Sequence, residues 1–193
     1  ILRSHYVKLF YRSALFLAAL GVYIYCAVSG HDVFFSTSIR ELHPVLVIAW
    51  AIYMLEMVLR LFPSKHESMG CQKQFKSNFI PTETSTPTLQ SARTTALVAL
   101  VWIVLNALIG ILYDTKLIDG GILLLICLFY SVCDMICILF FCPFQTWFMK
   151  NKCCGSCRIY NWDYAMMFTP LIYVPNPYAL SLLGTALVIL GRW

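Results

Sequence analysis

Long and nearly continuous runs of apolar residues recur along the chain, and polar or turn-forming residues separate them. The first four runs cover residues 15–28, 45–62, 96–113 and 121–141. A helix needs about 20 residues to cross the hydrocarbon core of a bilayer. Continuous runs of this kind lack the strict alternation of a membrane β-strand. The pattern therefore predicts an all-α polytopic membrane protein, with these runs as transmembrane helices.

The first run is short for a span unless its helix begins earlier, near Leu9. That start places Arg12 inside the helix, and we expect its long side chain to extend toward the membrane surface. A basic start, an apolar centre and the sequence Ala27-Val28-Ser29 are also typical of a signal peptide. We favour a helix that is retained as a membrane anchor.

A fifth apolar stretch, within residues 165–190, is interrupted by Pro175-Asn176-Pro177. Proline removes a backbone donor and disfavours helix at the residue before it. One arrangement is a single span broken in its middle, as in helices that line transporter sites. The other is a short interfacial or re-entrant helix, packed against protein, before a final span from about Pro177. The sequence predicts about five spans in either case.

The basic residues are distributed unevenly between the two sides of such a five-span protein. Eleven of the 14 lysines and arginines fall on one side: Arg3, Lys8, Arg12, Arg60, Lys65, Lys73, Lys76, Arg93, Lys150, Lys152 and Arg158. Only Arg40, Lys116 and Arg192 fall on the other side. The positive-inside rule then predicts a cytoplasmic N-terminus and an exterior C-terminus in a plasma (cytoplasmic) membrane. Residues 1–193 form a single bundle, with cytoplasmic loops at 63–94 and, rich in cysteine, at 142–164.

Composition supports this class of protein and excludes others. The chain is 60% hydrophobic and 12% charged, whereas soluble domains carry about 25% charged residues. The lipid bilayer is therefore its first partner, and we also expect a membrane-protein partner or a second copy of the chain. Scattered basic residues give no nucleic-acid signature. No hydrolase, metalloprotease or nucleotide-binding motif is present, which leans against an enzyme.

Five of the nine cysteines gather on the predicted cytoplasmic side: Cys71, Cys142, Cys153, Cys154 and Cys157. Cytosol is reducing, so clustered thiols there indicate metal or redox chemistry rather than disulfides. Cys154 and Cys157 form a C-x-x-C pair, and the set could supply four sulfurs to zinc or to an iron–sulfur cluster. Acylation of thiols beside the membrane and unliganded or redox-sensing thiols are the alternatives. Cys26, Cys127, Cys133 and Cys137 fall inside spans, where we expect them to pack as small apolar residues.

Two carboxylates stand inside predicted spans, and intramembrane charges indicate function by default. Glu56 and Asp134 lie at a similar depth, on the cytoplasmic side of the membrane centre. Arg60 follows Glu56 by one turn, so we expect an ion pair within that helix. Asp134 has no charged partner at helical spacing and is the candidate for a proton, cation or metal role. Asn106 is expected to hydrogen-bond to a neighbouring helix.

Three functional hypotheses follow from these features. The first is a membrane protein whose cytoplasmic cysteines hold a metal or an iron–sulfur centre, within a redox or electron-transfer assembly. The second is a small transporter or channel subunit that uses Asp134, Glu56 and the broken final helix at Pro175-Asn176-Pro177. The third is a structural or assembly factor whose long cytoplasmic loop docks a partner.

Overall fold

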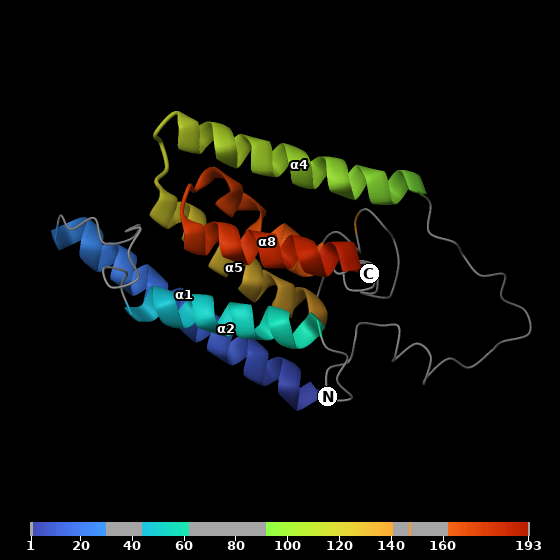
Figure 1. The fold of residues 1–193 in the computed structure, drawn as a ribbon, viewed down its shortest axis with the longest axis horizontal. Helices are drawn as coiled ribbons and strands as arrows, with labels where there is room; N and C mark the ends of the chain where they lie inside the picture. The colour runs from blue at the N-terminus through green and yellow to red at the C-terminus, as the bar shows by residue number, and fades with distance from the viewer. Residues whose placement is uncertain (1, 30–43, 62–91, 141–146, 148–161, 193) are drawn as a thin grey trace, which may run out of the picture.

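The computed structural model describes residues 2–29, 44–61, 92–140, 147 and 162–192, which form an all-helical bundle (Figure 1). Four helices are long and apolar enough to cross a membrane: α1 (Leu2–Ser29), α2 (Pro44–Leu61), α4 (Ala92–Asp114) and α5 (Gly120–Leu139). They coincide with the four apolar runs. The fold therefore confirms the helical membrane class.

The turn between α4 and α5 shows how local chemistry reverses the chain. The Thr115 hydroxyl donates to the Ile111 carbonyl at 2.9 Å, and Lys116 adopts a left-handed backbone with φ 60°. Asp119 then caps α5, because its Oδ1 accepts the backbone N–H of Ile122 at 2.8 Å. These bonds satisfy groups that the ends of helices leave without partners. Consequently α5 runs antiparallel to α4 (Figure 1).

The last part of the chain is a helical hairpin. Short α7 (Trp162–Phe168) continues into the 3-10 helix η2 (Thr169–Tyr173), and after a turn α8 (Pro177–Arg192) runs back. Pro177 is the first residue of α8, where a missing N–H costs nothing. Asn176 precedes it, and its Oδ1 accepts the backbone N–H of Tyr178 at 2.9 Å. The interruption expected from the prolines is thus a capped turn between two helices.

The hairpin returns to the end of the bundle from which it starts. α7 begins beside the C-terminal end of α2, where Asp163 forms an ion pair with Arg60. α8 then runs parallel to α2: Trp50 Nε1 donates to Ser181 Oγ at 2.9 Å. One turn further along both helices, the Thr185 hydroxyl lies 3.7 Å from Met54 Sδ.

Besides the four candidate spans, the described residues include the shorter apolar helix α8, and the fifth span and the sidedness of the chain stay predictions. The C-terminal end of α8 lies at the same end of the bundle as the start of α1 (Figure 1). The 16 residues of α8 extend about 24 Å, less than the hydrocarbon thickness of about 30 Å.

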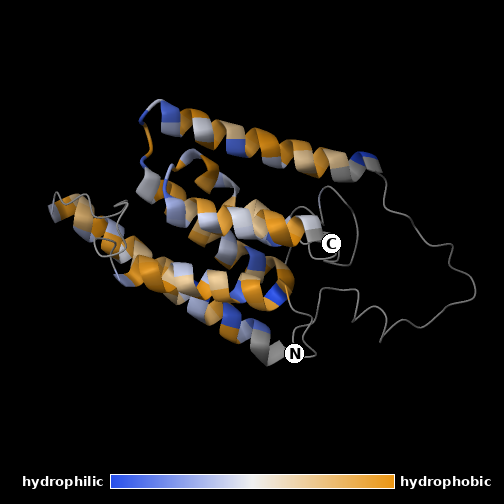
Figure 2. Ribbon diagram, viewed as in Figure 1, coloured by the Kyte–Doolittle hydropathy of each residue, from blue (hydrophilic) through white to orange (hydrophobic). Residues whose placement is uncertain are grey.

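Apolar residues cover the outside of the helices as well as the inside (Figure 2). Large exposed side chains occur on all four long helices, including Phe10 at 77%, Ile103 at 63% and Leu55 at 59% exposure. Hydrocarbon solvates such a surface readily, and water does not. Charged side chains gather instead inside one end of the bundle, the end where α1 begins.

Candidate functional site

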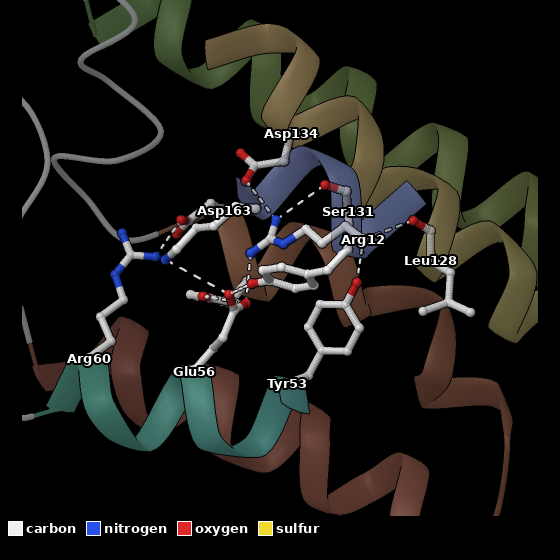
Figure 3. Close-up of polar contacts among 11 residues, drawn as sticks. Arg12, Tyr53, Glu56, Arg60, Leu128, Ser131, Asp134 and Asp163 are labelled. Atoms are coloured by element: carbon white, nitrogen blue, oxygen red, sulfur yellow. Dashed lines mark hydrogen bonds and ion pairs between the residues drawn. The ribbon is translucent and has the colours of Figure 1, made fainter. Parts of the chain in front are cut away.

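Arg12 of α1 is enclosed by three helices, with 1% of the residue exposed. Its Nη2 lies 2.8 Å from Oε2 of Glu56 on α2, and its Nη1 lies 3.2 Å from Oδ2 of Asp134 on α5. Nη1 also donates to the Ser131 carbonyl at 3.1 Å. Figure 3 shows the guanidinium between the two carboxylates. The expected extension of Arg12 toward the membrane surface does not occur, because carboxylates from other helices hold it inside.

Glu56 receives donors at both of its carboxylate oxygens. Besides the ion pair with Arg12, it accepts hydrogen bonds from the hydroxyls of Tyr11 and Tyr164, the second at 3.2 Å. Lys8 Nζ lies 3.7 Å from its Oε1. A buried carboxylate is tolerated only with such partners. Glu56 therefore joins α1, α2 and α7.

Arg60 forms its ion pair with the hairpin. The helical spacing predicts a pair within α2 instead. Arg60 Nη1 contacts the carboxylate of Asp163 at the start of α7, and its Cζ lies 5.0 Å from the centre of the Tyr164 ring. The local ion pair with Glu56 that the sequence predicts is replaced by this cross-helix pair, since Arg12 approaches Glu56 from α1. Sequence reasoning missed Asp163 and Tyr164 as members of the site.

Asp134 is the more accessible of the two intramembrane carboxylates. Its side chain is 20% exposed, against 11% for Glu56. One of its carboxylate oxygens accepts a hydrogen bond from Arg12, which lies 122 residues away in the sequence. Helical spacing could not reveal this partner, because it comes from another helix. Asp134 is thus the carboxylate of the site best placed to exchange a proton.

Tyr53 closes the site on the side that faces the bundle interior. Its hydroxyl shares a hydrogen bond with Ser131 Oγ, which also donates to the Leu128 carbonyl at 2.9 Å. The ring centre of Tyr53 lies 5.7 Å from Cζ of Arg12, within the range of a cation–π contact. A displacement of Arg12 can therefore move Tyr53, and a displacement of Tyr53 can move Arg12.

Six ionisable residues make up this charge network: Lys8, Arg12, Glu56, Arg60, Asp134 and Asp163. Three are cationic and three are acidic, so the set is neutral when all are ionised. A neutral, hydrogen-bonded set is what a low-dielectric bundle accepts, because an unpaired charge there costs several kcal/mol. The network connects four elements, α1, α2, α5 and the hairpin.

Asn106 makes its contact between helices differently from the prediction. Its side-chain amide donates to the Trp102 carbonyl in the same helix at 2.9 Å. The hydroxyl of Tyr173, at the end of η2, instead donates to the backbone carbonyl of Asn106 at 3.1 Å. Gly110 makes room for this contact, because a Cβ there would overlap the Tyr173 ring. This Tyr173 socket attaches α4 to the hairpin.

The cysteines proposed as metal ligands, Cys71, Cys142, Cys153, Cys154 and Cys157, lie outside the residues that the structure describes. The metal centre therefore stays a prediction. Within the described ranges, no group of three or more His, Cys, Asp or Glu residues is arranged to hold a metal ion. Of the four cysteines predicted inside spans, Cys26 and Cys127 are buried and the other two are partly buried.

Comparisons with protein families, with curated proteins and with solved structures find no match for this chain.

Proposed function

We propose that the protein is a small proton-linked membrane transporter, with Asp134 as the proton-exchanging group and the hairpin α7–η2–α8 as the moving part. One observation carries the proposal: the hairpin and the intramembrane charges form one connected unit. Tyr164 at the start of the hairpin donates to Glu56, and Asp163 pairs with Arg60. Interrupted helices beside buried charges are the usual architecture of transporter sites.

The chemistry assigns different tasks to the two carboxylates of the network. Glu56, with two cations and two phenols around it, remains an anion. A proton arriving on Asp134 removes one of the two charges that hold Arg12. The ion pair between α1 and α5 is then lost, and Arg12 keeps Glu56 and the Ser131 carbonyl as partners. Because Tyr164 is bonded to that same glutamate, the change reaches the hairpin.

The orientation that we propose places the charge network at the cytoplasmic face of a plasma membrane. Among the described residues, six basic residues lie at this end of the bundle: Arg3, Lys8, Arg12, Arg60, Arg93 and Arg192. Lys116 lies at the other end. This bias is the one that the positive-inside rule describes. A cytoplasmic N-terminus and a cytoplasmic end of α8 follow.

A distance measurement tests proton-driven movement without knowledge of the substrate. Spin labels at Ile172 on the hairpin and Phe129 on α5, both exposed, report their separation between pH 5 and pH 8. We expect two populations whose ratio changes with pH. Asp134→Asn should hold the low-pH population at every pH. The exposed Asp114→Asn, at the end of α4, is the matched control and should respond like the unmodified chain.

A proton-flux assay in liposomes then tests transport itself. With a pH gradient and an internal pH dye, we expect Asp134→Asn to lower flux at least tenfold relative to Asp114→Asn. A pH-independent label distance together with unchanged flux in Asp134→Asn would contradict the proposal.

A second proposal concerns the cysteine-rich segment, and the position of the network favours it. α5 ends three residues before Cys142, and α7 begins five residues after Cys157. Four of the five candidate zinc or iron–sulfur ligands, all but Cys71, are thus bounded in sequence by two elements of the charge network. Metal analysis of anaerobically purified protein, with optical spectra before and after Cys154→Ser and Cys157→Ser, tests this centre. Folded protein without metal would refute it.

A further inference from the structure

An apolar cavity lies between the hairpin, α2 and α5. Its walls include Trp50 and Tyr53 from α2, Cys127 and Leu128 from α5, and Leu171 and Leu182 from the hairpin. The cavity measures about 50 Å³, several times the space that one water molecule needs. It is also well below the volume of about 150 Å³ that holds a benzene ring. The space fits the end of a narrow chain better than a ring.

Three polar side chains in the cavity wall already have hydrogen-bond partners. Trp50 Nε1 donates to Ser181, the Tyr53 hydroxyl bonds to Ser131, and Asn176 Oδ1 accepts the backbone N–H of Tyr178. The wall contains no charged side chain. A charged or strongly polar occupant would lose its hydration without compensation, whereas an apolar occupant loses nothing.

We propose that this cavity binds the hydrocarbon end of an amphipathic, lipid-like molecule, which would be the substrate class of the proposed transporter. The role of this molecule in transport rests on the proposed function, whereas the binding site rests on the cavity itself. Four apolar helices with lipid-facing surfaces place the cavity beside hydrocarbon chains. Those chains are the narrow apolar molecules present at high concentration around it.

Tyr53 connects an occupant to the charge network. Its ring lines the cavity, and its hydroxyl bonds to Ser131 next to Arg12. The hairpin meets the same ring, because Phe168 packs edge-on against Tyr53 with ring centres 5.5 Å apart. A chain end that moves this tyrosine therefore acts on both the hairpin and Arg12. Binding of an apolar chain and binding of a proton would be coupled through one side chain.

Photo-crosslinking with decanoic acid that carries a diazirine at its methyl end tests the site. The full-length protein is labelled in nanodiscs, and mass spectrometry locates the adducts. We expect adducts at the wall residues Trp50, Cys127 and Leu128. Ala49→Leu, at a buried wall position, should lower their yield at least fivefold by filling the space. Ala51→Leu, on the exposed side of the same helix, should leave it unchanged.

A second filling variant, Ala179→Val, acts from the hairpin side of the cavity and keeps the test valid if Ala49→Leu does not fold. Wall adducts that persist at wild-type yield in a folded filling variant would overturn the proposal. Adducts found only on the lipid-facing surface would overturn it too. The pH-dependent label distance is a separate readout. Wall adducts together with a pH-independent label distance would refute proton coupling but support the cavity as a binding site for a hydrocarbon chain. A pH-dependent label distance without wall adducts would refute this binding site but support proton coupling.

Discussion

Two parts of the bundle are held together in different ways, although both consist of apolar helices. At the charge network, ion pairs and hydrogen bonds from Arg12 and Glu56 join α1, α2, α5 and α7. By contrast, α4 lies along the outside of the bundle (Figure 1). It is attached by the Tyr173 socket and by a ring contact between Trp102 and Tyr130, with centres 5.1 Å apart.

The difference reflects the few interactions that can drive helices to associate within a bilayer. Lipid chains are as apolar as leucine, so a helix gains little by exchanging lipid for protein contacts. Attraction must come from polar bonds or from close packing at small residues. The charge network uses the first, and α4 combines close packing at Gly110 with one hydrogen bond from Tyr173. The movement proposed for the hairpin would carry α4 with it, because the main attachment of α4 is to η2.

The largest effect is expected from removing Arg12. Arg12→Leu leaves Glu56 and Asp134 without the cation between them, and breaking a buried ion pair in this way costs about 3–5 kcal/mol. Unfolding in mixed micelles with increasing SDS, followed by circular dichroism, measures the loss. Arg12→Lys should recover part of it. A loss below 1 kcal/mol would mean that the network does not hold these helices together.

A smaller effect is expected from filling the Tyr173 socket. Gly110→Ala forces the Tyr173 ring to move, and overpacking of this kind costs about 1–3 kcal/mol. The change should increase the distance between labels on α4 and α5 and leave the charge network intact. Gly184→Ala in α8 is the control, since an added Cβ there meets no atom within 4 Å. Equal behaviour of the two variants would show that α4 does not depend on the socket.

The smallest effect is expected at the turn of the hairpin. Asn176→Ala removes the side-chain acceptor for the Tyr178 N–H, and loss of such a cap costs about 1 kcal/mol. Asn176→Ser should retain most of the stability, because its hydroxyl also accepts this bond. Hydrogen exchange of the first turn of α8 measures the change locally. Unaltered hydrogen exchange in Asn176→Ala would show that the Asn176 cap does not stabilise the hairpin.

The apolar runs were sufficient to predict the four long helices, because length and continuous hydrophobicity determine what crosses a bilayer. The prolines predicted the interruption near Asn176, but not the direction of α8. That direction depends on contacts such as Trp50 with Ser181, which no local pattern encodes. Only part of the site was predicted. The depth of Glu56 and Asp134 in their spans identified these two carboxylates, but their partner Arg12 was not identified. Arg12 lies 44 and 122 residues away from them, beyond any helical period.

Other parts of the site were assigned to the wrong kind of segment. Asp163 and Tyr164 fall within the loop predicted at 142–164, whereas α7 begins at Trp162. A seven-residue helix gives too short a periodic signal to recognise. The one available signal for Arg12 was its place inside an apolar run, since a charge in a span is costly and needs a partner.

The shortness of α8 has a consequence for biosynthesis. A segment of 16 residues with proline at its first position is a weak stop signal for a translocon, which recognises about 20 apolar residues. The backbone at Val174–Asn176 also needs protein around it before it can leave water. We therefore expect the hairpin to enter the membrane last, into a space already walled by α2 and α5. Assembly of the nascent protein would thus end with a folding step rather than with a translocation step.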